Sequence, residues 1–169
     1  MRILIILLFI SFNSLGQGID PNPITYKNLM QIDSETQFKR VMIENGYEFV
    51  EERENETYVY ARHPKKTKNR ESPRIGKKTR LDSPAWAWYH PNTNIFLFSF
   101  TKTLIDGSVN QSNTYDKIFS EVKRKCEFVK IEQTTTNMDF ACYTCPDASF
   151  EGYLGFHSDR ESGTIMRID

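Results

Sequence analysis

Apolar residues recur at helical spacing early in this chain. Phe38, Val41 and Met42 lie three and four positions apart, which is the spacing of one face of a helix. Ser34 followed by Gln37 predicts a capping box at the start of this helix. The helix is expected to end at residue 46, a glycine in the left-handed cap position.

A second helix is predicted over residues 115–125. Its apolar face consists of Ile118, Phe119 and Val122, again at helical spacing. Asn113 or Thr114 is expected to cap its first turn. A shorter helical turn within residues 26–32 is expected to pack its apolar residues against the core.

Alternating segments that are rich in aromatic and β-branched residues predict strands. They comprise residues 47–54, 57–63, 84–91, 95–101, 126–132, 138–145, 150–157 and 164–168. Residues 95–101 are almost continuously apolar, so this strand should be central in its sheet. In the first segment, alternation places Phe49 and Glu51 on one side and Val50 on the other.

The order of these elements indicates two similar units. Glu-Phe-Val follows each predicted helix, at 48–50 and 127–129, an offset of 79. We expect an α+β fold of two helix-plus-four-strand units, residues 34–102 and 115–169, joined by a linker at 103–114. Their strands would form one antiparallel sheet with the helices on one face. The alternative is a single α+β domain with coincidental similarities.

This order and unit length resemble the beta-lactamase inhibitory protein fold, which has tandem units of a helix and a four-stranded sheet. The resemblance is topological, covers roughly residues 24–169 and involves no sequence motif. It therefore carries over no functional residue. It implies only that an open, aromatic sheet face can be a protein-binding surface.

Residues 1–16 are predicted to be a cleavable signal peptide. Arg2 precedes an apolar run at 3–10, and Ser14 and Gly16 fit positions −3 and −1 of a cleavage site. The run is shorter than the roughly 20 residues that span a bilayer, although an uncleaved membrane anchor is the alternative. The mature chain, with a leader at 17–33, is expected to be secreted or periplasmic, without stable membrane insertion.

Three cysteines in such a compartment predict one disulfide and one free thiol. If residues 126–132 pair with 138–145, Cys126 lies opposite Cys145 or its near neighbour Cys142. Cys126–Cys145 is the preferred pairing, and Cys126–Cys142 is the alternative. The Cys142-x-x-Cys145 spacing does not predict a thioredoxin-type site, because that site needs a helix N-terminus.

Positive charge is concentrated in one predicted loop, residues 62–80. Lys and Arg balance Asp and Glu at 22 each overall, but this loop has nine basic residues and one acidic residue, a net of +8. Lys65, Lys66, Lys77 and Lys78 are candidates for binding an anionic envelope component. The favoured interpretation is a solvated, flexible insertion that offsets the acidic remainder of the chain. Nucleic acid is not an expected partner in the predicted compartment.

Aromatic residues supply the other candidate binding site. Tyr58 and Tyr60 share one side of a predicted strand, and Trp86 and Trp88 share one side of another. One set is expected in the core, while the other would be exposed, with Arg62 nearby, as an interface anchor.

The sequence contains no recognisable catalytic, cofactor or metal motif. Absence of a motif does not exclude an enzyme, since active sites assemble in space. The leading expectation, based on the open aromatic sheet face, is a secreted, non-enzymatic binding protein. The alternative is a small cell-envelope enzyme or envelope-maintenance factor.

Overall fold

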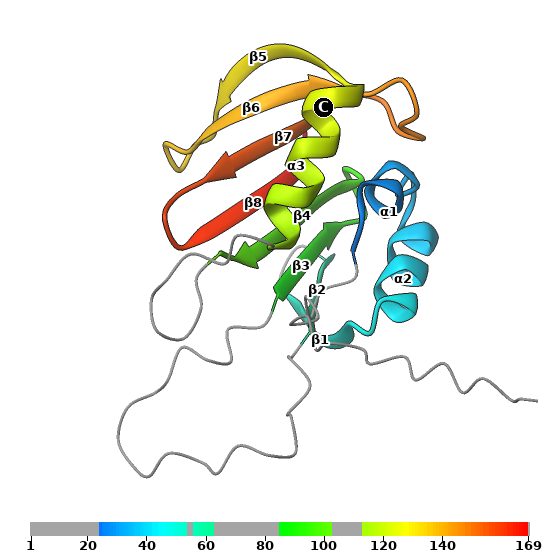
Figure 1. Ribbon diagram of the computed structural model, residues 1–169. Coiled ribbons are helices and arrows are strands. Elements are labelled where there is room, and N and C mark those ends of the chain that lie inside the picture. Colours follow the sequence, from blue (N-terminus) through cyan, green and yellow to red (C-terminus); the bar gives the residue numbers. More distant parts are fainter. Residues whose placement is uncertain (1–23, 54–55, 63–84, 103–112, 169) are drawn as a thin grey trace, which may run out of the picture.

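The computed structural model describes residues 24–53, 56–62, 85–102 and 113–168. The candidate lysines of the basic loop and the predicted signal peptide lie outside these residues. Within them, one antiparallel sheet carries helices on one side, so the predicted fold class is confirmed (Figure 1). No helix in the described ranges combines the length and apolar character needed to cross a membrane.

The sheet contains eight strands in the order β1-β2-β3-β4-β8-β7-β6-β5. In chain order these are β1 (Glu48–Arg53), β2 (Thr57–Arg62), β3 (Ala85–His90), β4 (Ile95–Thr101), β5 (Glu127–Gln133), β6 (Asp139–Thr144), β7 (Tyr153–Ser158) and β8 (Ser162–Ile168). The apolar β4 is central, as predicted, and pairs with β8, the last strand of the chain.

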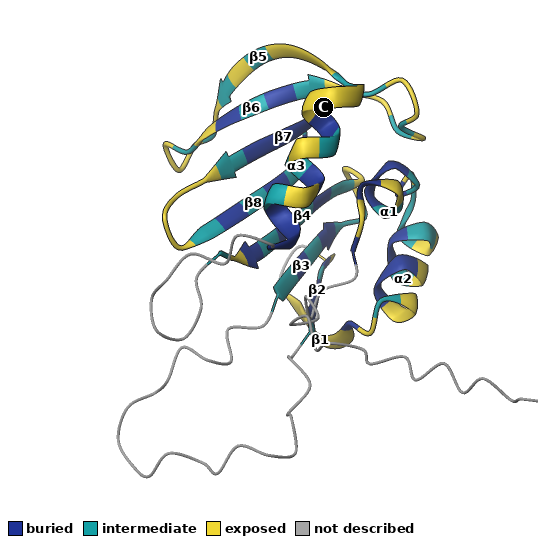
Figure 2. Cartoon of the chain, in the orientation of Figure 1, coloured by how far each residue is buried: buried dark blue, intermediate teal, exposed yellow. Residues whose placement is uncertain are grey.

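Three helices pack on the same side of the sheet: α1 (Tyr26–Met30), α2 (Glu35–Glu44) and α3 (Thr114–Lys125). Phe38 of α2 stacks on Tyr89 of β3, with ring centroids 4.9 Å apart. Phe119 of α3 stacks on Phe156 of β7 at the same distance. Figure 2 shows the buried residues on the inner sides of the helices and along the middle strands.

Local signals explain where the two longer helices begin and end. The Ser34 side chain accepts a hydrogen bond from the backbone N–H of Gln37, and Asn113 caps α3 in the same way through Asp116. The reciprocal bond of a capping box, in which the backbone N–H of Ser34 donates to the Gln37 side-chain oxygen, is absent. That oxygen is buried and has no hydrogen-bond partner. Gly46 follows α2 at φ +71°, a left-handed conformation that glycine adopts without strain.

The predicted leader is partly a core element. Tyr26, Leu29 and Met30 of α1 are all buried in the core. The Met30 carbonyl accepts hydrogen bonds from the backbone N–H and the hydroxyl of Ser149, at 2.8 and 2.7 Å. This segment is therefore fixed to the loop between β6 and β7, more than a hundred residues later.

One predicted side-chain orientation was wrong. The β1 register shifts between Phe49 and Glu51, where a β-bulge adds one residue to the strand. Phe49 pairs with Tyr60 on the helix side, whereas Glu51 pairs with Val59 on the other side. The extra residue reverses the alternation, so Phe49 and Glu51 lie on opposite faces.

Candidate binding face

The sheet side opposite the helices, here called the open face, is apolar in its middle. Cross-strand partners form a row across five strands, in which consecutive members are paired residues. The row consists of Trp88, Leu97, Met166, Gly155 and Cys142. Directly opposed side chains are close enough to pack together, so the row forms an apolar strip. At Gly155, which has no side chain, Ile168 and Phe140 occupy the adjacent space.

Two tryptophans of β3 dominate one half of this strip. The Trp86 and Trp88 rings are 6.0 Å apart and nearly parallel, at 25°. Their partners on β2 are small residues, Ala61 and Val59, and both are fully buried. The indoles themselves are only partly buried, so part of their surface remains accessible to a partner.

A more polar row runs beside the apolar one. Trp86 pairs with Ser99, Ser99 with Thr164, and Thr164 with His157. The His157 ring has its Nδ1 atom 2.9 Å from the carbonyl oxygen of Asp139. This row places hydroxyl and imidazole groups beside the apolar strip, where they could satisfy polar groups of a partner.

Charged residues on the open face are confined to its two ends. In the described residues, the four middle strands contribute no Lys, Arg, Asp or Glu to this side. On β1, Glu51 forms an ion pair with Arg53 at 2.6 Å. On β5, Lys130 and Glu132 form an equivalent pair at 2.7 Å. Each end also has one further glutamate on this side, Glu48 on β1 and Glu127 on β5, so the apolar middle is bounded by charged residues.

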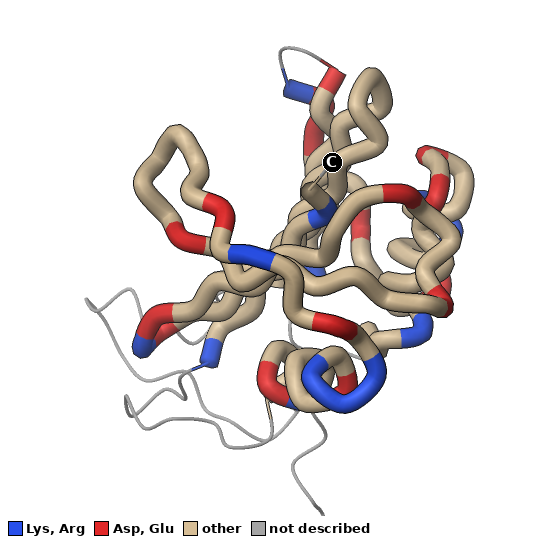
Figure 3. The backbone as a smooth tube through the Cα atoms, turned by 90° about the horizontal axis from the view of Figure 1, so that it is seen from above, with Lys and Arg blue, Asp and Glu red and all other residues tan. Residues whose placement is uncertain are grey.

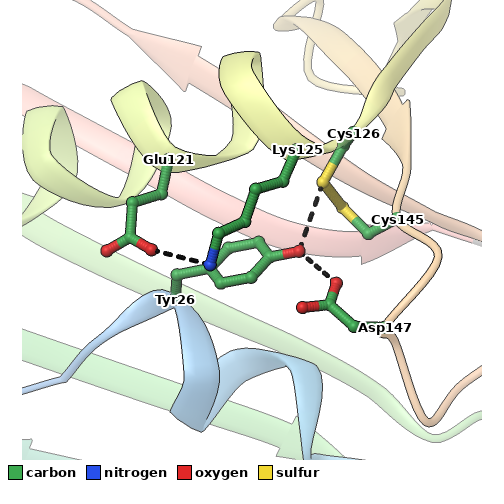
Figure 4. Close-up of a disulfide and its surroundings, with 6 residues drawn as sticks. All are labelled: Tyr26, Glu121, Lys125, Cys126, Cys145 and Asp147. Atoms are coloured by element: carbon green, nitrogen blue, oxygen red, sulfur yellow. Dashed lines mark hydrogen bonds and ion pairs between the residues drawn. A yellow bond between two sulfur atoms is a disulfide. The ribbon is translucent and has the colours of Figure 1, made fainter.

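The disulfide lies away from the open face, at the end of α3 (Figure 4). Cys126 is bonded to Cys145, which confirms the preferred pairing. The hydroxyl of Tyr26 donates to Asp147, and it also lies 3.5 Å from the Cys126 sulfur. The Lys125 ammonium, paired with Glu121 at 3.1 Å, lies over the Tyr26 ring.

This corner has a structural role. Burial, followed by the hydrogen bond to Asp147, raises the pKa of Tyr26 well above its usual value, so the phenol stays protonated.

The free thiol, Cys142, is buried on the open side of the sheet, and burial raises its pKa as well. A neutral, covered thiol is a poor nucleophile.

The structure separates the two predicted aromatic sets. Tyr58 and Tyr60 lie on the helix side, and Tyr60 is 6% exposed and packed against Phe38. The ammonium of Lys39 lies 4.3 Å above the Tyr58 ring. Arg62 is on the same side as these tyrosines, so it does not accompany the tryptophans. Only Trp86 and Trp88 of the described candidates belong to the open face.

Sequence reasoning missed the residues that complete the strip. Leu97 and Met166 lie on strands that were predicted, and alternation within each strand was clear. The register between strands was missing. It decides whether Leu97 and Met166 lie on the open face with Trp88 or on the helix side with Tyr89.

No cluster of three or more His, Cys, Asp or Glu suited to a metal ion occurs among the described residues. Comparison of the chain with protein-family models, with curated proteins and with solved structures gave no match.

Proposed function

We propose that this chain is a secreted, non-enzymatic protein that binds another protein through its open face. The observation that carries the proposal is the apolar strip around Trp88, Leu97 and Met166, free of charged side chains and bounded at each end by an ion pair. Protein interfaces commonly have such an apolar middle and a polar rim.

Trp86 and Trp88 are the proposed anchors. Tryptophan is enriched among residues that contribute most to binding, because a large ring loses much hydration when a partner covers it. The two indoles stack on each other and stand over small buried partners, so little side-chain entropy remains to be lost on binding.

The proposed compartment is the periplasm or the exterior. The signal-peptide pattern of residues 1–16 supports it, and so does the Cys126–Cys145 disulfide, because disulfides persist mainly in oxidising compartments.

Capture experiments with two matched variants test this function. The mature wild-type protein, the double variant W86A/W88A and the variant F49A would each be incubated with proteins from the source's own envelope and secreted fractions. Phe49 is an aromatic residue that is 56% exposed, but it lies on the helix side at the β1 edge. Circular dichroism and retention of the disulfide establish that each variant is folded.

The proposal expects a protein that wild type and F49A capture equally and that W86A/W88A captures at least about tenfold less, a loss of about 1.4 kcal/mol. Titration calorimetry with the purified partner then measures the difference directly. Equal capture by all three folded proteins, or no capture by the wild type, would contradict the proposal.

A further inference from the structure

The two edge strands of the sheet share a local design. In β1 and in β5, Glu-Phe-Val opens the strand, and the register shifts within it, between Phe49 and Glu51 and between Phe128 and Lys130. Each phenylalanine contacts a tyrosine of the neighbouring strand edge-on, Phe49 with Tyr60 and Phe128 with Tyr143. The two edges are therefore comparable position by position.

They differ in the three residues that follow the bulge. β1 continues with Glu51-Glu52-Arg53, and β5 continues with Lys130-Ile131-Glu132. The middle residue of each triplet points to the helix side, where Glu52 pairs with Tyr58 and Ile131 with Ala141. Glu52 is exposed, and Ile131 is an exposed apolar residue at 59%. Figure 2 shows most of β5 in the exposed colour.

The triplets differ at their central position when each is paired with a copy of itself. Two copies of an edge strand that meet antiparallel about a two-fold axis place the central residue opposite its own copy. On β5, Ile131 would face Ile131 of the partner subunit, and Lys130 would face Glu132 of the partner subunit. On β1, Glu51 would likewise face Arg53 of the partner subunit, but Glu52 would face Glu52 of the partner subunit. Like charges directly opposite destabilise a strand pair, whereas apolar and opposite-charge pairs stabilise it.

We propose that two copies of this chain associate through their β5 edges, forming a sheet that continues from one subunit into the other. The outer side of β5 has backbone groups that no strand in the described residues uses, and an edge of this kind is a template for another strand. The charge pattern Lys-Ile-Glu selects a second, antiparallel β5 as the occupant. Figure 3 views the molecule from this side, with both signs of charge along the edge.

The equivalent edge β1 is protected from the same association. Glu52 occupies the position where β5 has Ile131, and a glutamate that faces its own copy destabilises the strand pair. One self-complementary edge and one repelling edge give closed dimers and no open chains. Because opposed residues in a strand pair point to the same side, the open faces of both subunits would lie on one side of the dimer.

This inference does not depend on the proposed function, since β5 lies at the rim of the open face and pairs through its backbone. The regular ladder beyond the bulge is short, so the dimer is expected to be weak and reversible. Sedimentation equilibrium of the mature protein, up to about 1 mM, would detect it as a concentration-dependent rise in mass to twice the monomer.

Two isoleucine-to-glutamate variants provide the decisive comparison. I131E gives β5 the residue that β1 has, and it should abolish the dimer. I43E makes the same chemical change on α2, at a residue that is 71% exposed, and it should leave the dimer intact. A wild type that stays monomeric, a dimer that survives I131E, or equal loss in both variants would overturn the proposal.

A charge exchange covers the case in which I131E folds poorly. K130E alone places two glutamates against each other at both flanking positions, so it should weaken the dimer at least about tenfold. The double variant K130E/E132K restores opposite charges across the two-fold axis and should restore association. Failure of the double variant to recover, when it is folded, would also contradict the proposal.

Discussion

Gly163 of β8 shows how one residue position determines the packing of a helix. The ring of Tyr115, at the start of α3, occupies the space that a β-carbon at this position would need. Tyr115 in turn packs against Phe119 and Phe156. The absence of a side chain on the strand therefore allows the first turn of α3 to approach the sheet closely.

The variant G163A should be destabilised, because the added methyl group overlaps the Tyr115 ring. Overpacking of this kind costs about 1–3 kcal/mol, measured as the free energy of unfolding in urea. In a Tyr115→Ala background the same glycine substitution should cost much less, since the obstructing ring is gone. An equal cost in both backgrounds would show that the ring is not the cause.

Among the elements, the loop after β6 joins distant parts of the chain. Cys145, at the start of the loop, forms the disulfide with Cys126 at the end of α3. Asp147 accepts a hydrogen bond from the hydroxyl of Tyr26 in α1. The hydroxyl of Ser149 donates a hydrogen bond to the Met30 carbonyl. Phe150 then packs against Phe96 in the core. The loop therefore depends on covalent, polar and apolar contacts together.

Replacing both bonded cysteines, C126S/C145S, should lower the free energy of unfolding by about 3 kcal/mol, the value expected for closing a loop of this separation, 19 residues. Hydrogen exchange should increase mainly in residues 24–32 and 145–150, because they share the contacts that the disulfide supports.

Cys142, the free cysteine, provides a separate test of the disulfide pairing. A thiol count on the wild-type protein should find one free cysteine per chain, alkylated only after unfolding, since Cys142 is fully buried. Two or three free thiols would contradict the Cys126–Cys145 pairing.

Predictability from sequence differed between kinds of element. Local chemistry predicted the helices, the strands and most turns, because caps such as Ser34 and Gly46 act within a few residues of the backbone they satisfy. The bulge in β1 was not predictable in this way, since it is defined against the neighbouring strand. The tandem repeat of two helix-plus-four-strand units stays a prediction.

The candidate site was predictable only in part, for the same physical reason. Alternation identified the pairs Tyr58 with Tyr60 and Trp86 with Trp88, but it could not show which pair the helices cover. That choice depends on the register between β2 and β3, where Tyr58 pairs with Tyr89 and Val59 with Trp88. Long-range pairing thus determined which aromatic residues remain on the open face.

For the molecule as a whole, buried tyrosines make stability sensitive to alkaline pH. Burial raises the pKa of both Tyr89 and Tyr115 from 10.0 to about 12. The contribution of these two phenols to the free energy of unfolding is fully present below pH 10, because both the folded and the unfolded chain then keep them protonated. It is lost as the pH rises from 10 towards 12, since only the unfolded chain ionises there.

Urea unfolding should therefore give a lower free energy of unfolding at pH 11 than at pH 8. The decrease is at most about 1.4 kcal/mol for each tyrosine and for each pH unit above 10. The double variant Y89F/Y115F provides the comparison, because lysines also titrate in this range. It should lose less stability than wild type over the same interval, and an equal loss would assign the effect to other groups.

The central position of β8 has a consequence for how the chain is made. Residues 162–168 follow the other seven described strands along the chain, yet β8 fills the gap between β4 and β7. Until it is synthesised, both neighbours present unpaired edges, and the sheet cannot close. The strands β1 to β4 and β5 to β7 join into one sheet only through β8, so complete folding of the sheet requires residues 162–168 and depends on long-range pairing.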